Sequence, residues 1–420
     1  MSLWAEIGWV AARFSSMLPN CSSQRIMPPN CSAETSAFII PSMAPPLREG
    51  QLPLPALLSQ ALVAFTIEFD NEFEHRTPHR TTDYGSTPGA VNPPWLVSMV
   101  MWTKYLRHIP GDGVTVSELQ LLTRSGPKEL QQWLTRLAQW WGYLRIERSP
   151  ASGPPKRLQP DAIVRPTPGG QKALEVWRPL TEIIEGRWQQ RFGRELIEAL
   201  RQSLTSVVSQ LDPALPGSLP ILGYGLSSSE PEAGMRTLPT ASPLETSLPA
   251  LFSKLLLAFA IEFERESPLS LAIAANVLRL AGEPLVPIKD LPRLSGVSKA
   301  AIAMAVSFLE KRGYAVAKPE LPGSRVKLLV LTTKGLEAHD ACGQLIWAIE
   351  ERWRHGFGSD KLQRVRELLE PLIGEPNVRP SSLMSGLQPC PGCWRASLPA
   401  PETLPHYPMI LHRGGYPDGS

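Results

Sequence analysis

The sequence predicts a mainly helical chain in which one domain occurs twice. Two decapeptides, IEGRWQQRFG at 184–193 and IEERWRHGFG at 349–358, share six of their ten residues. The pattern AFxIEF occurs at 64–69 and again at 258–263. Between these motifs each copy carries two short helical segments followed by a pair of strand-like segments. Because motifs that recur in the same order mark repeated domains, we expect two copies of one helical domain with a small β-hairpin.

The repeat divides the chain into five predicted regions. These are an N-terminal extension at 1–50, copy 1 at 51–212, a linker at 213–245, copy 2 at 246–373 and a C-terminal tail at 374–420. The extension is polar and aperiodic, so we expect it to be disordered, and Met43 is a candidate for the true translation start. The linker is rich in Pro, Ser and Gly, and as a flexible coil it spans roughly 30 Å. That reach allows the two copies to pair.

Composition places the chain among globular proteins. Its 420 residues are 43% hydrophobic and 19% charged, and its 44 prolines lie mostly outside periodic segments. No uncharged apolar run approaches the length of a membrane span, so we expect no membrane segment. Five scattered cysteines do not form a disulfide framework, which predicts a reducing cytoplasm. The net charge of +3 permits nucleic-acid binding without arguing for it.

The first helix of each copy is predicted from apolar residues spaced by three and four around AFxIEF. The two copies are offset by 194 residues in this helix and by 172 at the next shared pair, Leu-Arg at 106–107 and 278–279. Copy 1 therefore carries about 22 extra residues between these points. Their composition predicts a polar loop.

The middle of each copy predicts two short helices joined by a tight turn. The turns are marked by Ser-Gly at 125–126 and at 295–296, and Leu119 and Leu122 of copy 1 correspond to Leu291 and Leu294 of copy 2. Gly-Tyr at 142–143 and 313–314 marks the end of the second helix, where glycine supplies the C-cap. This order is typical of a helix-turn-helix.

Two strands and two long helices complete each copy. In copy 2, YAVAKPELPGSRVKLLVLTTKG predicts strand, turn and strand, and Thr332 or Thr333 is expected to cap the next helix. Copy 1 has a longer version of this hairpin. The following helix carries the repeated decapeptide, and a final amphipathic helix follows it. A β-hairpin after a helix-turn-helix is the wing of a winged helix.

This order of elements resembles the MarR-like winged-helix family of bacterial regulators. The best local match lies at 294–335, with LSGVSKAA, LEKRGY and SRVKLLVLTTKG, and the resemblance covers roughly residues 50–212 and 246–373. It implies a cytoplasmic, dimeric regulator of transcription that binds double-stranded DNA, often with a small-molecule effector near the dimer interface. It also implies pairing through the first and last helices, so we expect the two copies to form an intrachain pseudo-dimer. Further oligomerisation stays open.

The repeated decapeptide is expected to lie at the interface between the copies. The alternative is that Trp188 and Phe192 are core residues within one copy. Arg187 and Arg352 are expected to be solvated or to pair with the glutamates of their own decapeptides, Glu185 and Glu350.

The second helix of each helix-turn-helix and the wings supply the candidate DNA-binding residues. Gln reads adenine with two hydrogen bonds, and basic side chains hold phosphates. The candidates are Lys128, Gln131, Gln132 and Arg136 in the helix of copy 1, Lys156 and Arg157 in its wing, Ser298 and Lys299 at the start of the helix of copy 2, Lys311 and Arg312 at its end, and Arg325 and Lys327 in the second wing. Copy 2 departs from the family at Ala303 and Met304, where relatives place polar residues. The departure leaves open an asymmetric DNA site or the loss of DNA binding in one half.

A second function stays open, namely a degenerate pair that binds a protein partner or small ligand without reading DNA. The apolar helix of copy 2 and the modest net charge favour it. No nucleophile–base pair or phosphate-binding loop is present, so we expect neither enzymatic activity nor a cofactor.

Three other features are candidate sites. His75, His79 and Asp83 suit either a solvated loop or, less readily, a metal site. Cys390 and Cys393 form a lone CxxC, which is either accidental or redox-sensitive, because zinc sites of this type need a second pair. Apolar residues near the C-terminus, including Tyr407, are expected to dock onto the body.

Overall fold

The computed structural model describes residues 51–77, 79, 94–147, 158–221, 246–282, 284–374 and 382–408. Contacts divide the chain into two units, Met1–Leu52 and Pro53–Ser420, and every element described below belongs to the second unit. The predicted N-terminal extension with Met43, and most of the polar loop of copy 1, lie outside the described residues.

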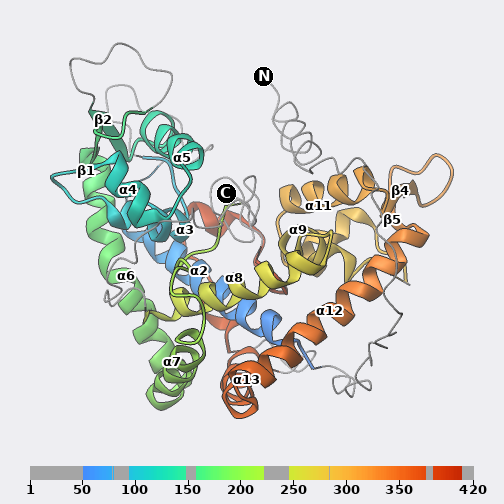
Figure 1. Ribbon diagram of the computed structural model, residues 1–420. Helices are drawn as coiled ribbons and strands as arrows, with labels where there is room; N and C mark the ends of the chain where they lie inside the picture. Colours follow the sequence, from blue (N-terminus) through green and yellow to red (C-terminus); the bar gives the residue numbers. More distant parts are fainter. Residues whose placement is uncertain are drawn as a thin grey trace, which may run out of the picture. The chain divides into compact units, whose positions relative to one another are not determined.

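The described residues are mainly helical, with two small antiparallel sheets, as the sequence predicts (Figure 1). The first repeat contains α2 (Leu54–Arg76), α3 (Met99–Lys104), η1 (Leu106–His108), β1 (Val114–Thr115), α4 (Val116–Thr123), α5 (Pro127–Gln139), β2 (Leu144–Glu147), β3 (Ile163–Pro166), α6 (Pro168–Phe192) and α7 (Arg194–Val208).

The second repeat follows the same order with similar lengths. It contains α8 (Leu248–Glu266), α9 (Leu271–Leu278), η4 (Ile288–Asp290), α10 (Leu291–Ser295), α11 (Lys299–Lys311), β4 (Ala315–Pro319), β5 (Lys327–Leu331), α12 (Thr333–Phe357) and α13 (Ser359–Ile373). Two short 3₁₀ helices follow, η5 (Met384–Gly386) and η6 (Trp394–Ser397). None of the helices in the described ranges has the length and apolarity needed to cross a membrane.

The two sheets differ by one strand. In the first repeat the strand order is β1-β3-β2, with Val114 opposite Val164. In the second repeat β4 pairs with β5 alone, and only an isolated bridge from Pro287 to Leu328 stands where a third strand would be. The sequence predicted a simple hairpin in both repeats. Val114–Thr115 was not predicted because a strand of two residues has no periodicity to detect.

The long helices α6 and α12 begin in the same way. The Thr167 hydroxyl accepts a hydrogen bond from the Gly170 N–H, and the Thr332 hydroxyl accepts one from the Gly335 N–H. Thr332, rather than Thr333, is therefore the N-cap. A Cβ added to Gly335 would overlap the carbonyl oxygen of Tyr314, so only glycine lets this helix approach the strand so closely.

Within each repeat the decapeptide packs against AFxIEF. The Trp188 indole N–H donates to Glu68 at 3.0 Å, and the Trp353 indole N–H donates to Glu262 at 2.7 Å. Phe65 meets the Trp188 ring edge-on at a centroid distance of 5.3 Å, and the equivalent pair of the second repeat has the same distance. The tryptophan is thus a core residue of its own repeat, as the alternative interpretation held.

The glutamate of each decapeptide instead reaches the other repeat. Glu185 accepts a hydrogen bond at 2.8 Å from the backbone N–H of Leu248, the first residue of α8. Reciprocally, Glu350 accepts one at 3.0 Å from the N–H of Leu54, the first residue of α2. A carboxylate satisfies the unpaired N–H groups and the positive end of a helix. Each repeat therefore caps the first helix of the other.

Contrary to one prediction, Arg187 and Arg352 do not pair with the glutamates of their own decapeptides. Arg187 pairs with Glu72 of α2 at 2.6 Å, and Arg352 pairs with Glu262 and Glu266 of α8. Glu185 and Glu350 are instead occupied by arginines of the following helix, Arg201 and Arg366 respectively. The reason is helical geometry, since the glutamate and the arginine are two positions apart and such residues do not face each other on a helix.

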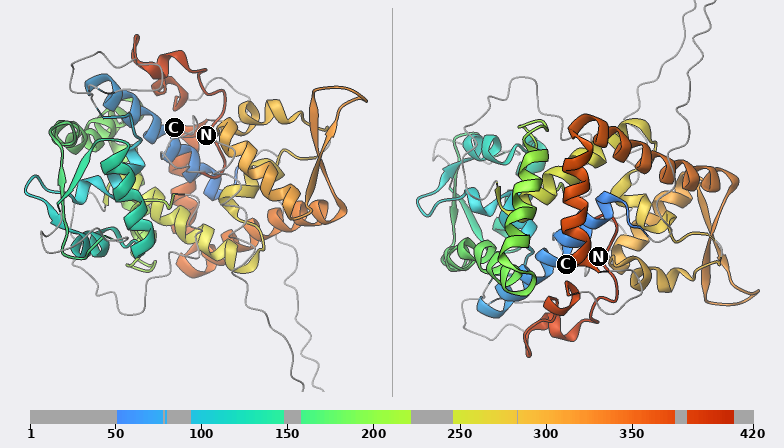
Figure 2. Two further views of the ribbon diagram at one scale, coloured as in Figure 1. Left: turned by 90° about the horizontal axis from the view of Figure 1, so that it is seen from above. Right: turned by 90° about the horizontal axis from the view of Figure 1, so that it is seen from below.

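The first helices lie at the centre of the second unit. α2 contacts α8, α6 and α13, while α7 contacts α13 and α8. Figures 1 and 2 show α5 and α11 on opposite sides of the α2–α8 pair. Most of α2 is buried because other helices cover it on several sides. The buried residues include three carboxylates, Glu68, Asp70 and Glu74.

Candidate nucleic-acid interface

The turn between α4 and α5 matches the turn between α10 and α11. Arg124 and Gly296 both adopt a left-handed conformation immediately after the first helix. Two residues later, Gly126 and Ser298 are the N-caps of α5 and α11. The two Ser-Gly pairs mark the turns but are not equivalent positions, because the left-handed residue in the first repeat is Arg124.

Four side chains form a stripe along the outer face of α5. Lys128, Gln132, Arg136 and Trp140 follow one another at intervals of four residues, which places them on one side of a helix. Lys128, Gln132 and Trp140 are exposed, and Arg136 is half-buried. Gln131, beside the stripe, is also half-buried. The inner face carries Leu130, Trp133, Leu134 and Leu137, which are buried.

Arg136 is held in place by two indole rings. Its guanidinium carbon lies 4.9 Å from the Trp133 ring centroid and 5.6 Å from that of Trp140. Such contacts orient a guanidinium while leaving its N–H groups available to a further acceptor. Trp140 is 54% exposed, an unusually large exposure for a tryptophan side chain. Trp133 is buried in the core, so Arg136 lies between a core ring and a surface ring.

The start of α11 is less suited to contact bases. Ser298 accepts a hydrogen bond at 3.1 Å from the Ala301 N–H and thereby caps the helix. The hydroxyl thus serves as a helix cap and keeps its own O–H as a donor, so Ser298 stays a candidate DNA contact. Lys299 is exposed, as are Ala300 and Ala303 along the same helix.

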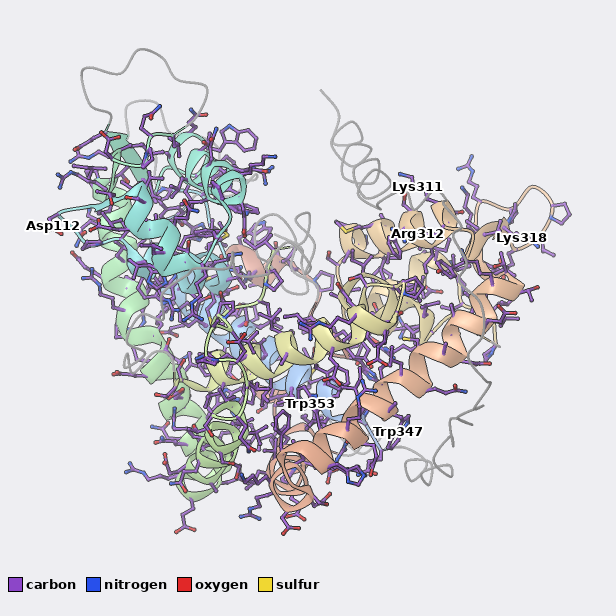
Figure 3. All side chains as sticks on the ribbon, viewed as in Figure 1. Asp112, Lys311, Arg312, Lys318, Trp347 and Trp353 are labelled. Atoms are coloured by element: carbon purple, nitrogen blue, oxygen red, sulfur yellow. The ribbon has the colours of Figure 1, made fainter. Side chains whose placement is uncertain are left out.

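Basic residues gather at the end of α11 and on the hairpin β4–β5. Lys311, Arg325 and Lys327 are exposed, and Arg312 lies 4.8 Å over the Phe308 ring. Lys318 on β4 is also exposed and lies beside the end of α11 (Figure 3). Lys318 was not among the predicted DNA-binding residues, because YAVAK contains a single polar residue and shows no alternation of polar and apolar positions.

The wing of the first repeat is described only in part. Lys156 and Arg157 lie outside the described residues. In the described part, Arg165 is 2.9 Å and Arg145 3.3 Å from Glu147. The single carboxylate offsets one of the two positive charges, so this group of three side chains keeps a net charge of +1.

The C-terminal segment 382–408, which we call the C-terminal brace, packs along the first repeat. The Asn71 amide donates to the Leu387 carbonyl at 3.0 Å, and the Ser59 hydroxyl donates to the Pro405 carbonyl at 2.8 Å. The Glu74 carboxylate accepts hydrogen bonds from the N–H groups of Trp394 and Arg395. Both ends of α2 thus bind the brace.

The brace continues onto α9 and α10 of the second repeat. Asn276 on α9 exchanges two hydrogen bonds with the backbone of Tyr407, which is buried as expected for a docking residue. Arg293 of α10 pairs with Glu402 at 3.0 Å. A Cβ added to Gly296 would lie 2.6 Å from the carbonyl oxygen of Thr403. The brace therefore lies directly on the turn between α10 and α11.

The CxxC of the brace forms a tight turn with two free thiols. The Cys393 N–H donates to the Cys390 carbonyl at 3.1 Å, and Gly392 has a positive φ. Burial and the nearby Glu74 carboxylate raise the pKa of the Cys393 thiol. A raised pKa lowers the thiolate fraction, which favours the unreactive interpretation.

The histidine cluster shows no metal-like arrangement. His79 lies 3.5 Å from Glu74, His75 is exposed, and Asp83 lies outside the described residues. Across the described ranges, no three His, Cys, Asp or Glu side chains are grouped so as to hold a metal ion.

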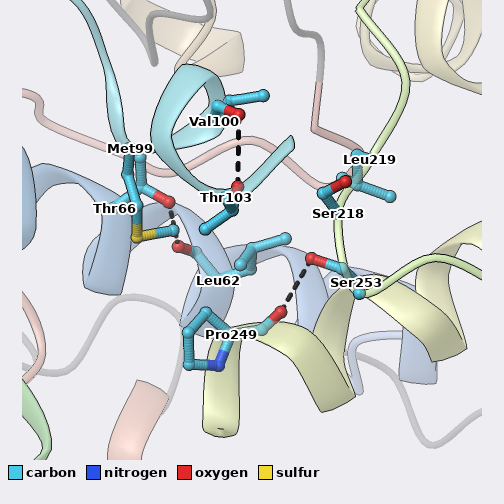
Figure 4. A pocket seen from close by; sticks show the side chains of 10 residues that line it. Leu62, Thr66, Met99, Val100, Thr103, Ser218, Leu219, Pro249 and Ser253 are labelled. Atoms are coloured by element: carbon cyan, nitrogen blue, oxygen red, sulfur yellow. Dashed lines mark hydrogen bonds between the residues drawn. The ribbon is translucent and has the colours of Figure 1, made fainter. Parts of the chain in front are cut away.

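A small cavity lies where the repeats meet. It is lined by residues of α2, α3 and α8 and by residues 217–219 (Figure 4). The hydroxyls of Thr66 and Ser253 donate to carbonyls of their own helices, so the lining offers few unsatisfied polar groups. The cavity measures about 10 Å³, room for one water molecule, whereas a drug-sized ligand needs about 300 Å³ or more. It does not support an effector site.

No protein-family model matches the chain, and none of the curated proteins matches it.

Proposed function

We propose that this chain is a DNA-binding transcription regulator. Its two repeats would be winged helix-turn-helix domains that act as an intrachain pseudo-dimer. The observation that carries the proposal is the exposed stripe of Lys128, Gln132, Arg136 and Trp140 on α5. In a helix-turn-helix the second helix enters the major groove. Lysine holds phosphates, while glutamine and arginine form paired hydrogen bonds with adenine and guanine.

Element order supports the winged-helix part of the proposal. Each repeat has two helices joined by a turn with a left-handed residue, then antiparallel strands, then a long helix. This order is what the resemblance to the MarR-like family implies. The C-terminal brace lies outside that resemblance.

Contacts between the repeats support the pseudo-dimer. The reciprocal bonds from Leu248 to Glu185 and from Leu54 to Glu350 relate the repeats as two subunits of a symmetric dimer would be related. The pairing also involves the first and last helices, α2 with α8 and α7 with α13. A dimer would hold its two helix-turn-helix units in a defined geometry, which DNA binding requires.

The test is a titration of the purified chain with labelled duplex DNA at several salt concentrations. We use random-sequence duplex and duplex from upstream of the chain's own gene. A regulator is expected to bind both at low salt and to prefer specific sites at higher salt. Failure of the folded chain to bind any duplex at about 50 mM salt would contradict the proposal.

Three single variants sharpen this test. Lys128→Ala is expected to reduce the slope of log K against log salt by about 0.9, because one phosphate contact is lost. Arg136→Ala is expected to cost about 1–3 kcal/mol of discrimination between sites. Lys361→Ala, an exposed lysine on α13 far from α5, is the matched control and should change neither (Figure 1).

The alternative function is binding of a protein partner by a pair of degenerate domains. The specific observation in its favour is a set of exposed apolar side chains in the second repeat, with Leu321 67%, Leu336 53%, Leu285 45% and Val316 42% exposed. A partner that covers such side chains would remove apolar area from water. If the titration shows no DNA binding, the next measurement is a pull-down with the intact chain.

A further inference from the structure

The reading helices of the two repeats can be compared position by position. α5 and α11 each have 13 residues. Their N-caps, Gly126 and Ser298, each lie two residues after the left-handed residue of the turn. The four α5 positions that carry candidate base-reading or phosphate-binding groups have apolar counterparts in α11. Lys128, Gln131, Gln132 and Arg136 correspond to Ala300, Ala303, Met304 and Phe308.

This difference affects the surface that a base pair would meet. Ala300 and Ala303 are exposed, and Met304 and Phe308 are half-buried. Base edges are distinguished by hydrogen-bond donors and acceptors. Alanine and phenylalanine have none, and the methionine thioether is only a weak acceptor. The middle of the outer face of α11 therefore has few groups that tell one base pair from another, and its exposed polar side chains, Lys299, Glu310 and Lys311, lie at the two ends of the helix.

The C-terminal brace makes the second helix-turn-helix still less accessible. Thr403 lies against Gly296, in the turn immediately before α11. Glu402 neutralises Arg293 of α10, which would otherwise be available to a phosphate. Glu402 is itself 62% exposed at its side chain and adds negative charge beside the helix. At the corresponding turn of the first repeat, Arg124 donates to the Pro213 carbonyl, whereas a Cβ added to Gly126, the N-cap of α5, would meet no atom within 4 Å.

The second repeat nevertheless has exposed cationic side chains at some distance from this turn. Lys311, Lys318, Arg325 and Lys327 stand at the end of α11 and on the wing. None of the four pairs with a carboxylate of a described residue. Cations of this kind bind phosphates in any sequence.

We infer that sequence readout is confined to α5, and that the second repeat holds the DNA backbone without reading bases. The inference rests on the proposed function and makes it more specific. It predicts a binding site with one block of defined bases and a flank of unspecified duplex. Gln131, Gln132 and Arg136 would determine the specificity.

The first experiment is selection of sites from a random duplex library with the full chain. We expect one contiguous block of preferred bases with no inverted copy. The double variant Gln131→Ala/Gln132→Ala is then expected to reduce the ratio of specific to random affinity by about 10- to 100-fold. Because Gln131 is half-buried, circular dichroism first establishes that the double variant is folded, and a folded double variant with an unchanged specificity ratio would contradict the inference.

The matched variants lie in the second repeat. Met304→Ala is expected to leave the base preferences unchanged. Lys311→Ala/Lys327→Ala is expected to weaken binding to all duplexes alike and to lower the salt slope by about 1.8, with the specificity ratio unchanged.

Two outcomes would overturn the inference while leaving the proposed function intact. One is a selected site with two inverted half-sites of equal definition. The other is a change of preferred bases in Met304→Ala or in the double lysine variant. Absence of binding to every duplex at low salt would instead overturn the proposed function, and the inference with it.

Discussion

Loss of the carboxylate at Glu350 should destabilise the chain more than loss of the equivalent Glu185. Glu350 and Arg366 have side chains that are both 3% exposed, and Glu350 also caps α2 through the Leu54 N–H. Breaking a buried pair by removing one partner costs about 3–5 kcal/mol, because the other charge stays buried. Losing the cap adds about 1 kcal/mol. For Glu350→Ala we therefore expect about 4–6 kcal/mol.

The Glu185 pair is more accessible to water. Glu185 is 11% exposed and Arg201 22% exposed, and water solvates part of the arginine if the glutamate is removed. We discount the pair accordingly and expect about 2–3 kcal/mol for Glu185→Ala, cap included. Gln substitutions keep an oxygen that can accept the backbone N–H, so each should lose less than the alanine variant.

The assay is urea unfolding of the intact chain, followed by tryptophan fluorescence and by far-UV circular dichroism. If m is about 3 kcal/mol per M, the Glu350→Ala midpoint should fall by more than about 1 M, and the Glu185→Ala midpoint by less. Equal shifts for the two alanine variants would refute the argument from burial. A Glu350→Ala midpoint equal to wild type would refute the reciprocal capping itself.

Two other perturbations follow from close packing and from charge. Gly335→Ala should destabilise the chain by about 1–3 kcal/mol because its Cβ overlaps the Tyr314 carbonyl. The control is Gly343→Ala, in open space on the same helix, which should stabilise the chain by about 0.5–1 kcal/mol. Thermal unfolding measures both, and a Gly335→Ala variant as stable as wild type would contradict the close packing. Burial and the Arg279 charge lower the pKa of His406 to about 3 from an ordinary 6.5. An undocked brace thus binds a proton that the docked brace does not, so docking is fully stable above about pH 6.5 and weakens as the pH falls towards 3. Limited proteolysis of the brace at pH 7.5 and 5 should show this loss in wild type, and the same loss in His406→Gln would show that another group is responsible.

The duplication, the helical class and the ends of several helices were predictable from the sequence. The repeated motifs identify the two copies, and Thr332 before a helical period identifies an N-cap. These features depend on residues within a few positions of one another, so short-range periodicity and capping chemistry suffice to predict them. The candidate residues on α5 were found for the same reason, since Lys128 and Gln132 lie on a recognisable helix.

Only the tertiary structure decided which groups meet across long separations. Arg187 binds Glu72, 115 residues away, rather than its neighbour Glu185, and Glu185 serves the first residue of α8 instead. The contact of Thr403 with Gly296 could not be read from either segment. Such pairings depend on how whole helices are rotated and translated against one another. A difference of one residue in rotation turns a side chain by about 100°, from an interface to solvent. Local sequence patterns specify which face of a helix is apolar, and packing selects the partner that covers it.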